Sequence, residues 1–212
     1  MYLSRLILNP RTRRVQRELA NLYELHRTLM RSFPASLPDD ERVLFRVDTD
    51  PRRAVPTILL QSHTRPDWAW LDDPGARGYL LAAPETKPFD LSFTPSQVLA
   101  FRLRANPTVK RRFNEKDHKR VGLYREEEQR AWLERKGEAG GFRVLSVAIV
   151  GEGSINGRLH REDETHQLNL LAVRFDGLLQ VTDPDRLCET IRQGIGSGKG
   201  LGFGLLSLAR PA

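Results

Sequence analysis

The chain is 212 residues long, with 39% hydrophobic and 29% charged residues, so it can bury a core in one large domain or in two small ones. Its formal net charge of +7 favours a polyanionic partner, although a basic soluble protein without such a partner has the same balance. The single cysteine, Cys188, excludes an internal disulfide framework and a zinc site built from several cysteines.

Neither a membrane segment nor an export signal is visible in the sequence. No apolar run approaches the roughly 20 residues that a helix needs to cross a bilayer. The basic residues near the N-terminus follow a short apolar stretch, which is the reverse of a secretory signal peptide. We therefore expect a cytoplasmic protein that does not associate with membranes.

The first half of the chain predicts strands and helices in the order of a ferredoxin-like unit. Asn9-Pro10 ends a buried strand, Thr12 can cap a helix, and Asn21 with Glu24 has the spacing of a capping box. The proline-rich stretch 65–95 is expected to be mostly irregular. The expected elements are a strand over 2–8, helices over 13–20 and from 22 to about 33, and strands over 43–48, 57–62 and 97–105. This order matches βαββαβ with a degraded second helix.

A second round of the same order follows. Its expected elements are a helix over 125–136, strands near 142–150, 154–161, 166–175 and 178–182, a helix over 184–193 and a strand over 204–209. We therefore predict an α+β fold of two tandem ferredoxin-like (RRM-like) βαββαβ domains, the second modified. The predicted domains are an N-terminal one over 1–105 and a C-terminal one over 125–212, joined by a basic linker over 106–124.

Two basic segments are candidates for nucleic-acid contact. The linker run from Lys110 to Arg120 fits either a solvated connector or a phosphate-binding segment. Arg158, His160 and Arg161 gather beside the turn of the expected hairpin over 154–175, which fits a probe for helical RNA or an edge hairpin protected by charge. No carboxylate or third histidine completes a metal site there, so we expect no bound metal and no cofactor.

The glycine-rich segment GIGSGKGLGFGLLSLA, from Gly194 to Ala209, does not match the nucleotide-binding motifs. Lys199 is followed by Gly200 instead of Ser or Thr, and the GxGxxG spacing is broken. A flexible loop remains in which Lys199 and the backbone N–H groups of Gly198 and Gly200 can approach a phosphate closely. The alternative is that these glycines only permit tight turns.

The helix over 21–30, NLYELHRTLM, carries the candidate catalytic residues. Tyr23 and His26 are spaced i, i+3 and share a face, with Arg27 beside them. A histidine can take a proton from a ribose 2′-hydroxyl or give one to a departing 5′-oxygen, and arginine can neutralise the crowded phosphate. His26 also lies close to the apolar stripe of Leu22, Leu29 and Phe33, so the spacing alone favours a core histidine over a catalytic one.

Four ordered segments together resemble the CasE family, the CRISPR RNA endoribonucleases of the type I-E Cascade complex. The resemblance spans essentially the whole chain, with one departure at Leu22, where some relatives have proline. The matching segments are LNP at Leu8–Pro10, YELHRTL at Tyr23–Leu29, FRLRANP at Phe101–Pro107, and GIGSGKGLGFGLLS at Gly194–Ser207, the last being the hallmark loop of the RAMP superfamily.

This resemblance implies metal-independent cleavage of precursor CRISPR RNA at the 3′ base of its repeat hairpin, leaving a 5′-hydroxyl and a 2′,3′-cyclic phosphate. By position, His26 and Tyr23 match the family's catalytic pair. The RNA-binding residues we expect are Arg27, Arg104, Arg158, Arg161, Lys199, Gly198 and Gly200. We expect a monomer when free that keeps its product and joins other Cascade subunits. The alternative is a non-catalytic RNA-binding RAMP scaffold.

Overall fold

The computed structural model of the chain describes residues 1–50, 52–112, 118–161 and 164–211, and the side chains of 112, 118, 156–161 and 164–169 lie outside that description. The strands form two four-stranded sheets and one two-stranded ribbon. The chain divides into two compact units. The first comprises 1–90, 157–167 and 199–202, and the second comprises 91–156, 168–198 and 203–212.

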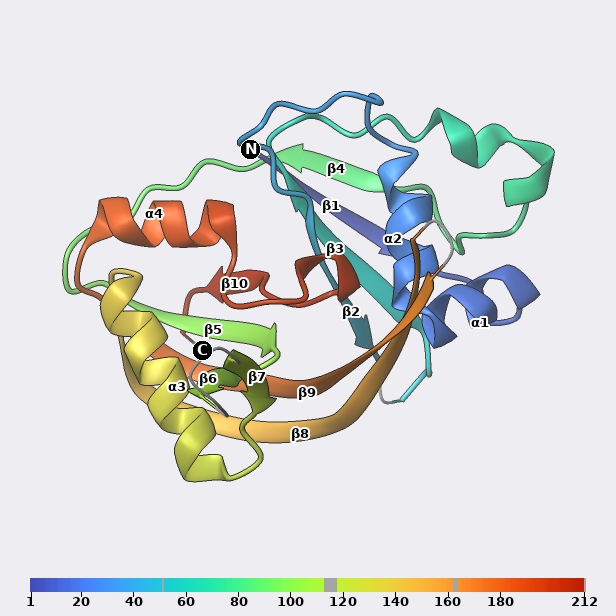
Figure 1. The fold of residues 1–212 in the computed structure, drawn as a ribbon. Coiled ribbons are helices and arrows are strands. Elements are labelled where there is room, and N and C mark those ends of the chain that lie inside the picture. Colours follow the sequence, from blue (N-terminus) through green and yellow to red (C-terminus); the bar gives the residue numbers. More distant parts are fainter. Residues whose placement is uncertain (51, 113–117, 162–163, 212) are drawn as a thin grey trace. The chain divides into compact units, whose positions relative to one another are not determined.

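The first unit is an antiparallel sheet in the order β2-β3-β1-β4 (Figure 1). In ferredoxin-like units this is the order in which the first and third strands occupy the centre. Short 3-10 turns, η1 (Ala69–Asp72) and η2 (Pro74–Ala76), stand in place of the second helix. The other elements are β1 (Tyr2–Ile7), α1 (Arg13–Ala20), α2 (Leu22–Met30), β2 (Leu44–Thr49), β3 (Pro56–Ser62) and β4 (Glu85–Pro88).

The core of the first unit forms between α1, α2 and one face of this sheet. Alternate side chains of a strand point to the same face, and here Leu6 of β1 with Ile58 and Leu60 of β3 are fully buried. Leu25 and Leu29 supply the apolar stripe of α2 and are fully buried as well. Burial of this stripe fixes which face of α2 is turned away from the core.

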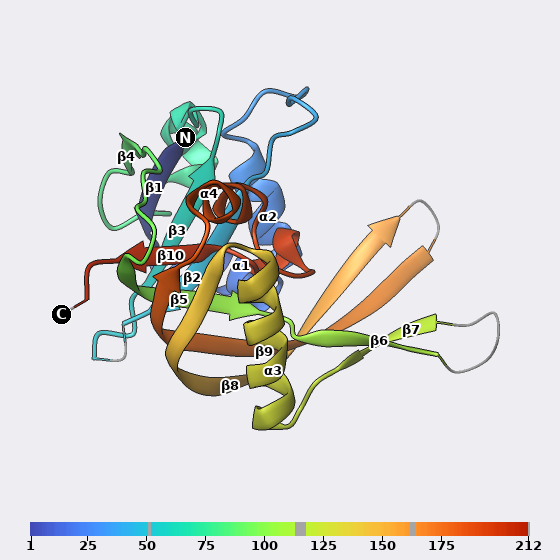
Figure 2. The same ribbon diagram turned by 90° about the vertical axis from the view of Figure 1, so that its left-hand side faces the viewer.

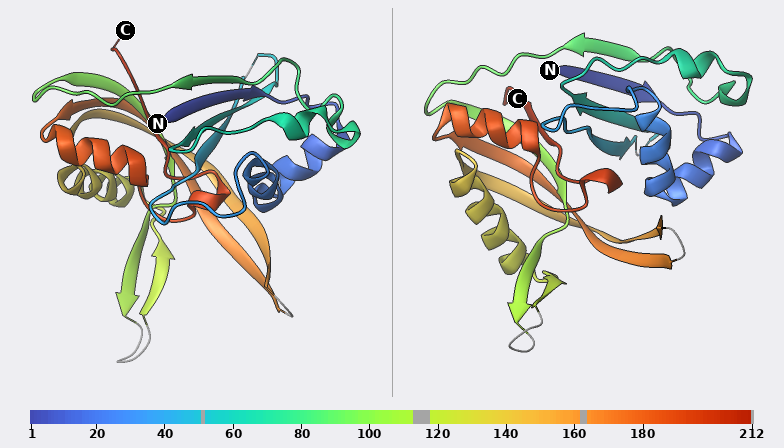
Figure 3. Two further views of the ribbon diagram at one scale, coloured as in Figure 1. Left: turned by 90° about the horizontal axis from the view of Figure 1, so that it is seen from above. Right: turned by 45° about the horizontal axis from the view of Figure 1, so that its top comes forward.

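The second unit repeats the same order of elements with one insertion. Its sheet runs β10-β5-β9-β8, and the C-terminal end of α3 contacts α4, where Gly140 lies against Thr190 (Figure 3). Trp132 of α3 stacks on Phe175 of β9 in the core, with ring centroids 6.0 Å apart. The elements are β5 (Val98–Ala105), β6 (Thr108–Arg112), β7 (His118–Gly122), α3 (Glu126–Ala139), β8 (Phe142–Arg161), β9 (Glu164–Val181), α4 (Pro184–Gln193) and β10 (Leu206–Ala209). The 3-10 turn η3 (Lys199–Leu201) comes between α4 and β10 in the chain and belongs to the first unit.

The predicted class, two tandem ferredoxin-like units, is confirmed, but one strand was placed in the wrong unit. The strand expected to end the first unit is present as β5, yet it pairs with β9 and β10 in the second sheet. The fourth strand of the first sheet is β4, in the stretch expected to be irregular. β4 has four residues, follows Pro84 and ends with Pro88, so its pairing with β1 and not its own propensity makes it a strand.

Two further expectations for the second half are corrected. The basic connector contains the β6–β7 ribbon, with Thr108 opposite Gly122. The four expected strands over 142–182 are two long ones, β8 and β9. A Cβ at Gly177 would lie 2.0 Å from the carbonyl oxygen of Ser146 on β8, so this glycine permits close approach of two strands and does not end one.

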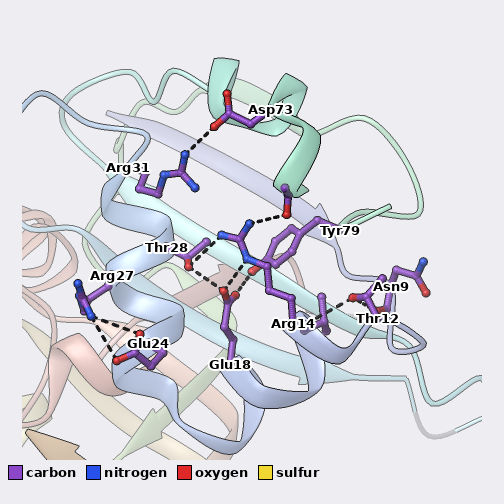
Figure 4. Close-up of polar contacts among 12 residues, drawn as sticks. Asn9, Thr12, Arg14, Glu18, Glu24, Arg27, Thr28, Arg31, Asp73 and Tyr79 are labelled. Carbon is purple, nitrogen blue, oxygen red and sulfur yellow. Dashed lines mark hydrogen bonds and ion pairs between the residues drawn. The ribbon is translucent and has the colours of Figure 1, made fainter. Parts of the chain in front are cut away.

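A buried carboxylate joins α1 and α2 to the segment that replaces the second helix (Figure 4). Glu18 is 2% exposed, and it accepts hydrogen bonds from Arg14 Nε at 2.9 Å, Thr28 Oγ1 at 2.8 Å and the Tyr79 hydroxyl at 2.5 Å. The Arg14 guanidinium also lies 5.0 Å from the Tyr79 ring centroid. Burial, together with the hydrogen bond to Glu18, raises the pKa of the Tyr79 phenol. This cluster therefore holds the C-terminal half of α2, where Thr28 lies.

In the part of the chain that the structure describes, none of the helices is long and apolar enough to cross a membrane.

We predict that Tyr79→Phe destabilises the fold. The change leaves the buried Glu18 carboxylate with one donor fewer, which costs about 1–3 kcal/mol. The matched control is Tyr124→Phe, because Tyr124 is 70% exposed and water replaces its hydroxyl. Thermal midpoints of the two variants measure the effect, and equal midpoints would contradict a stabilising role for the Glu18 cluster.

Candidate functional site

The helix that carries the candidate residues begins at a shared cap. Asn21 ends α1, where its N–H donates to the Arg17 carbonyl at 3.1 Å. It also starts α2, where its side chain accepts from the Tyr23 N–H at 3.3 Å. Because the Asn21 N–H is already used, Glu24 does not complete the expected capping box and instead binds Arg27. By fixing where α2 starts, the cap sets the direction in which the side chains of Tyr23 and His26 project from the helix.

The His26 ring lies beside a phenyl ring and a glycine backbone. It stacks on Phe45 of β2, with ring centroids 6.1 Å apart and an interplanar angle of 11°. On η3, a Cβ at Gly200 would stand 3.5 Å from His26 Cδ2 and 3.6 Å from Nε2. The Nε2 edge of the imidazole therefore faces the backbone of the glycine-rich segment within the first unit.

Gly202 allows the same segment to approach Phe45. Its φ is +77°, a conformation that favours glycine, and a Cβ there would lie 3.2 Å from Cε2 of the Phe45 ring. Lys199 begins η3, one residue before the glycine that faces His26. The glycine-rich segment thus places a bare backbone beside the imidazole, with Lys199 one residue earlier in the chain.

Burial sets the protonation state of His26. Because the ring is removed from water, its pKa lies below the ordinary value of 6.5. Its Nδ1 atom is buried and has no hydrogen-bond partner among the described residues. Burial acts here without an opposing carboxylate, so the free protein carries a neutral imidazole at neutral pH. A neutral imidazole can accept a proton.

The other two candidates on α2 are less constrained. Tyr23 is half-buried, one turn before His26. Arg27 is exposed, and its Nη1 lies 3.4 Å from Glu24, a surface ion pair of the kind that contributes little to stability (Figure 4). The Arg27 guanidinium can therefore exchange this carboxylate for a phosphate at small cost.

The remaining predicted residues fall into two groups. Lys199 and Gly200 join His26, Tyr23 and Arg27 in the first unit, whereas Arg104 and Gly198 belong to the second. Arg104 Nε donates to Glu152 at 2.6 Å, and its guanidinium lies 5.2 Å from the Phe203 ring centroid. The side chains of Arg158 and Arg161 lie outside the described residues.

Sequence reasoning missed Phe45 as part of the site. It is fully buried, as expected of a core-facing aromatic, and its partner His26 is distant in sequence. No local pattern predicts that contact. The one feature of the sequence that pointed to this contact was the glycine run that contains Gly202. Glycines allow a backbone to approach a neighbouring group closely, and here that group is the Phe45 ring.

The comparisons cover nearly the whole chain. A family model described as CRISPR associated protein matches residues 1–210. CRISPR-associated endoribonuclease Cse3 of Thermus thermophilus is 41% identical in an alignment of 218 positions that covers 99% of this chain and 100% of the relative. CRISPR system Cascade subunit CasE of Escherichia coli is 34% identical in an alignment of 222 positions that covers 99% of each chain.

The fold agrees with these sequence matches. The solved structure of Thermus thermophilus Cse3 bound to an RNA representing a pre-cleavage complex has a TM-score of 0.82 and 41% identity, and covers 98% of each chain. The family match and both relatives extend through the candidate helix and the glycine-rich segment alike. The chain belongs to the CRISPR-associated protein family of Cse3 and CasE.

Proposed function

We propose that this protein is a metal-independent endoribonuclease that binds the repeat hairpin of precursor CRISPR RNA and cuts it at the 3′ base of the stem. The observation that carries the proposal is the His26 imidazole, held with its Nε2 edge against the backbone of Gly200. The relative that is 41% identical is named an endoribonuclease, and the solved structures of Cse3 include one bound to a 19 nt RNA. A net charge of +7 suits a polyanionic substrate.

The reaction is an internal transesterification. The ribose 2′-oxygen attacks the adjacent phosphorus, its proton leaves to a base, and the bond from phosphorus to the 5′-oxygen breaks as that oxygen takes up a proton. The products are a 2′,3′-cyclic phosphate and a 5′-hydroxyl. Because the nucleophile belongs to the substrate, no metal-bound water is required.

His26 is the group that transfers protons, as general base or general acid. Its lowered pKa supplies the neutral form that accepts the 2′-hydroxyl proton. Tyr23 orients the nucleophile or assists the transfer from the same helix face. Arg27 and Lys199 neutralise the charge on the phosphorane, with the backbone N–H groups of the glycine-rich segment beside it.

The remaining contacts hold the hairpin. Arg158 and Arg161, with Gly198 and Gly200, are proposed to read the stem and its phosphates, and Arg104 to support them. The protein then retains its product and assembles with other Cascade subunits, in keeping with the name of the CasE relative.

A non-catalytic RNA-binding scaffold is the second candidate function. It accounts for the charge and the ferredoxin-like units equally well. It does not account for a half-buried histidine whose Nε2 faces a glycine backbone, because a scaffold gains nothing from that arrangement. Cleavage of a hairpin RNA separates the two functions directly.

We predict that chelation leaves cleavage unchanged within about twofold, since general acid–base catalysis supplies the rate without a metal. Among the described residues, no group of three or more His, Cys, Asp and Glu side chains could hold a metal ion. Single-turnover cleavage of a repeat hairpin is measured with and without EDTA. Loss of activity in EDTA with recovery in magnesium would overturn the mechanism.

We predict that His26→Ala slows cleavage by about 10²–10⁴-fold, the usual contribution of general acid–base catalysis. Hairpin affinity should stay near that of the wild type, because a neutral imidazole contributes little to holding a polyanion. The matched control is His63→Ala, at a histidine just beyond β3 that has no role in the proposed reaction. Single-turnover rate, hairpin affinity and thermal midpoint are measured on each variant.

The alternative, a histidine with only a packing role, predicts a different set of results. Loss of packing would lower the thermal midpoint, and binding and cleavage would fall together. A folded His26→Ala variant that cuts at the wild-type rate would remove His26 from the site and favour the scaffold.

We predict that His26 makes stability depend on pH. The unfolded chain has the ordinary pKa of 6.5 and the folded protein a lower one, so between the two values the unfolded state binds the extra proton. The contribution of neutral His26 to the free energy of unfolding is therefore fully present above pH 6.5. It is lost as the pH falls toward the His26 pKa of the folded protein. Thermal midpoints of the wild type and His26→Gln between about pH 5 and pH 8 should converge or cross as the pH falls. A constant difference would contradict the lowered pKa.

A further inference from the structure

The glycine-rich segment contains a closed loop, residues 195–204, whose two ends meet. The N–H of Ile195 donates to the carbonyl oxygen of Gly204 at 2.9 Å, and the N–H of Gly204 donates to the carbonyl oxygen of Arg104 at 2.8 Å. Residues 199–202 form the middle of this loop, and among them is Gly200, which lies beside His26. The loop is therefore anchored at its ends, but its glycines give it little stiffness of its own.

A buried aromatic ring joins the two limbs of the loop. Phe203 is fully buried, and a Cβ at Gly198 would lie 3.0 Å from Cδ2 of the Phe203 ring. These two residues flank 199–202 in the sequence, so the ring packs the limb that enters the middle of the loop against the limb that leaves it. The position of the Phe203 ring therefore determines how the two limbs are spaced.

Arg104 of β5 contacts this loop through both its backbone and its side chain. Its carbonyl oxygen accepts the Gly204 N–H, and its guanidinium lies 5.2 Å from the centroid of the Phe203 ring. A cation over an aromatic face is attracted by the negative potential of that face. The Arg104 side chain is only 14% exposed, whereas that of Arg27 is 65% exposed. The Arg104 guanidinium is thus directed at the loop and largely withdrawn from solvent.

A carboxylate on β8 holds the Arg104 guanidinium in this position. In the sheet of the second unit, β5 and β8 lie on either side of β9 (Figure 2). Arg104 is directly opposite Arg174 of β9, and like charges in such a pair repel each other. Glu152 lies 2.6 Å from Arg104 Nε and 3.4 Å from Arg174 Nη1, so one carboxylate neutralises both cations.

We infer that Arg104 is a positioning residue, which Glu152 holds against Phe203 so that the glycine-rich loop keeps the shape that places Gly200 beside His26. The inference rests on the proposed function, because the loop serves the proposed cleavage reaction. It assigns Arg104 to the loop in place of the phosphate contact expected from the sequence. To reach a phosphate, the guanidinium has to leave a short charge-assisted hydrogen bond and an aromatic ring together.

Stabilisation of the sheet alone does not explain these contacts. Arg174 also pairs with Asp176 at 2.9 Å, and Arg102 pairs with the same carboxylate. These partly exposed pairs contribute little to stability and reach no part of the loop. Only the pair of Arg104 and Glu152 is placed against the Phe203 ring. Asp176 therefore offers a matched control within the same network.

The first test separates the rate of cleavage from the binding of RNA. Arg104→Gln and Glu152→Gln should each slow single-turnover cleavage of a repeat hairpin by roughly 10–100-fold, because a shift of about 1 Å in a positioned group can cost a factor of that size. Hairpin affinity and its salt dependence should match those of the wild type. Loss of a phosphate contact would instead lower the log–log salt slope by roughly one.

Three further variants show whether Glu152 acts through Arg104. The double variant Arg104→Gln/Glu152→Gln should cleave no more slowly than Arg104→Gln, since residues that act as one unit are not additive. Arg104→Lys keeps a cation beside the ring and the carboxylate, and should recover most of the rate. Asp176→Asn removes a carboxylate of the same network that does not contact Arg104, and should cleave as the wild type does.

The second test follows the loop without RNA. The amide protons of Ile195 and Gly204 close and anchor the loop, so their hydrogen exchange reports how often it opens. Exchange at both amides should be faster in Arg104→Gln and Glu152→Gln by about 2–30-fold, the factor that corresponds to loss of a cation–π contact. It should be unchanged in Asp176→Asn. If Arg104→Gln does not fold, Glu152→Gln carries the same test, because it leaves the Arg104 side chain in place.

Three results would overturn the inference: a flatter salt slope in Arg104→Gln, equal slowing of cleavage by Glu152→Gln and Asp176→Asn, or wild-type exchange at Ile195 and Gly204 in both glutamine variants. The exchange measurement does not depend on catalysis. Wild-type protein that cuts no hairpin would therefore contradict the proposed function, while faster exchange in the two variants would still support Arg104 as the residue that holds the loop.

Discussion

The packing of the His26 ring against Phe45 and Gly200 is the constraint on which the site depends. It requires three segments, α2, β2 and η3, to meet within the first unit. An imidazole packed in this way cannot rotate freely, so its Nε2 edge has one direction. Burial then keeps the ring neutral. Orientation and protonation state therefore follow from the same packing, and neither needs a carboxylate partner.

The buried Glu18 cluster has a different function from the site, although both involve α2. A carboxylate 2% exposed is costly unless its oxygens are fully hydrogen-bonded. Arg14, Thr28 and Tyr79 supply those bonds from α1, α2 and the segment after η2. This segment replaces a helix, and its backbone is joined to the sheet by the antiparallel bridge of Leu80 to Leu8, just beyond β1. The polar cluster ties it to the two helices and so limits movement of the helix that carries His26.

Sequence reasoning predicted the elements that local chemistry determines and failed where pairing at a distance decides. Thr12 and Asn21 cap their helices as expected, since caps act within one turn. β4 escaped prediction because a four-residue strand that follows one proline and ends with another has no strand propensity of its own. β5 was found but placed in the wrong sheet, because alternation of apolar residues does not say which strand is the neighbour. The same limit hid Phe45, which stacks on His26, whereas spacing and resemblance favoured Tyr23 and His26 as candidates.

A net charge of +7 does not by itself locate a nucleic-acid surface, since many of the arginines are already committed. Arg5, Arg31 and Arg174 have carboxylate partners, as do several others, and such pairs add nothing to the field that an RNA backbone meets. A side chain suited to binding phosphate is a cation whose neighbours are other cations or weakly held carboxylates. Arg27, with its long exposed pair to Glu24, meets that condition. The distribution of carboxylates thus says more about where RNA can bind than the distribution of basic residues does.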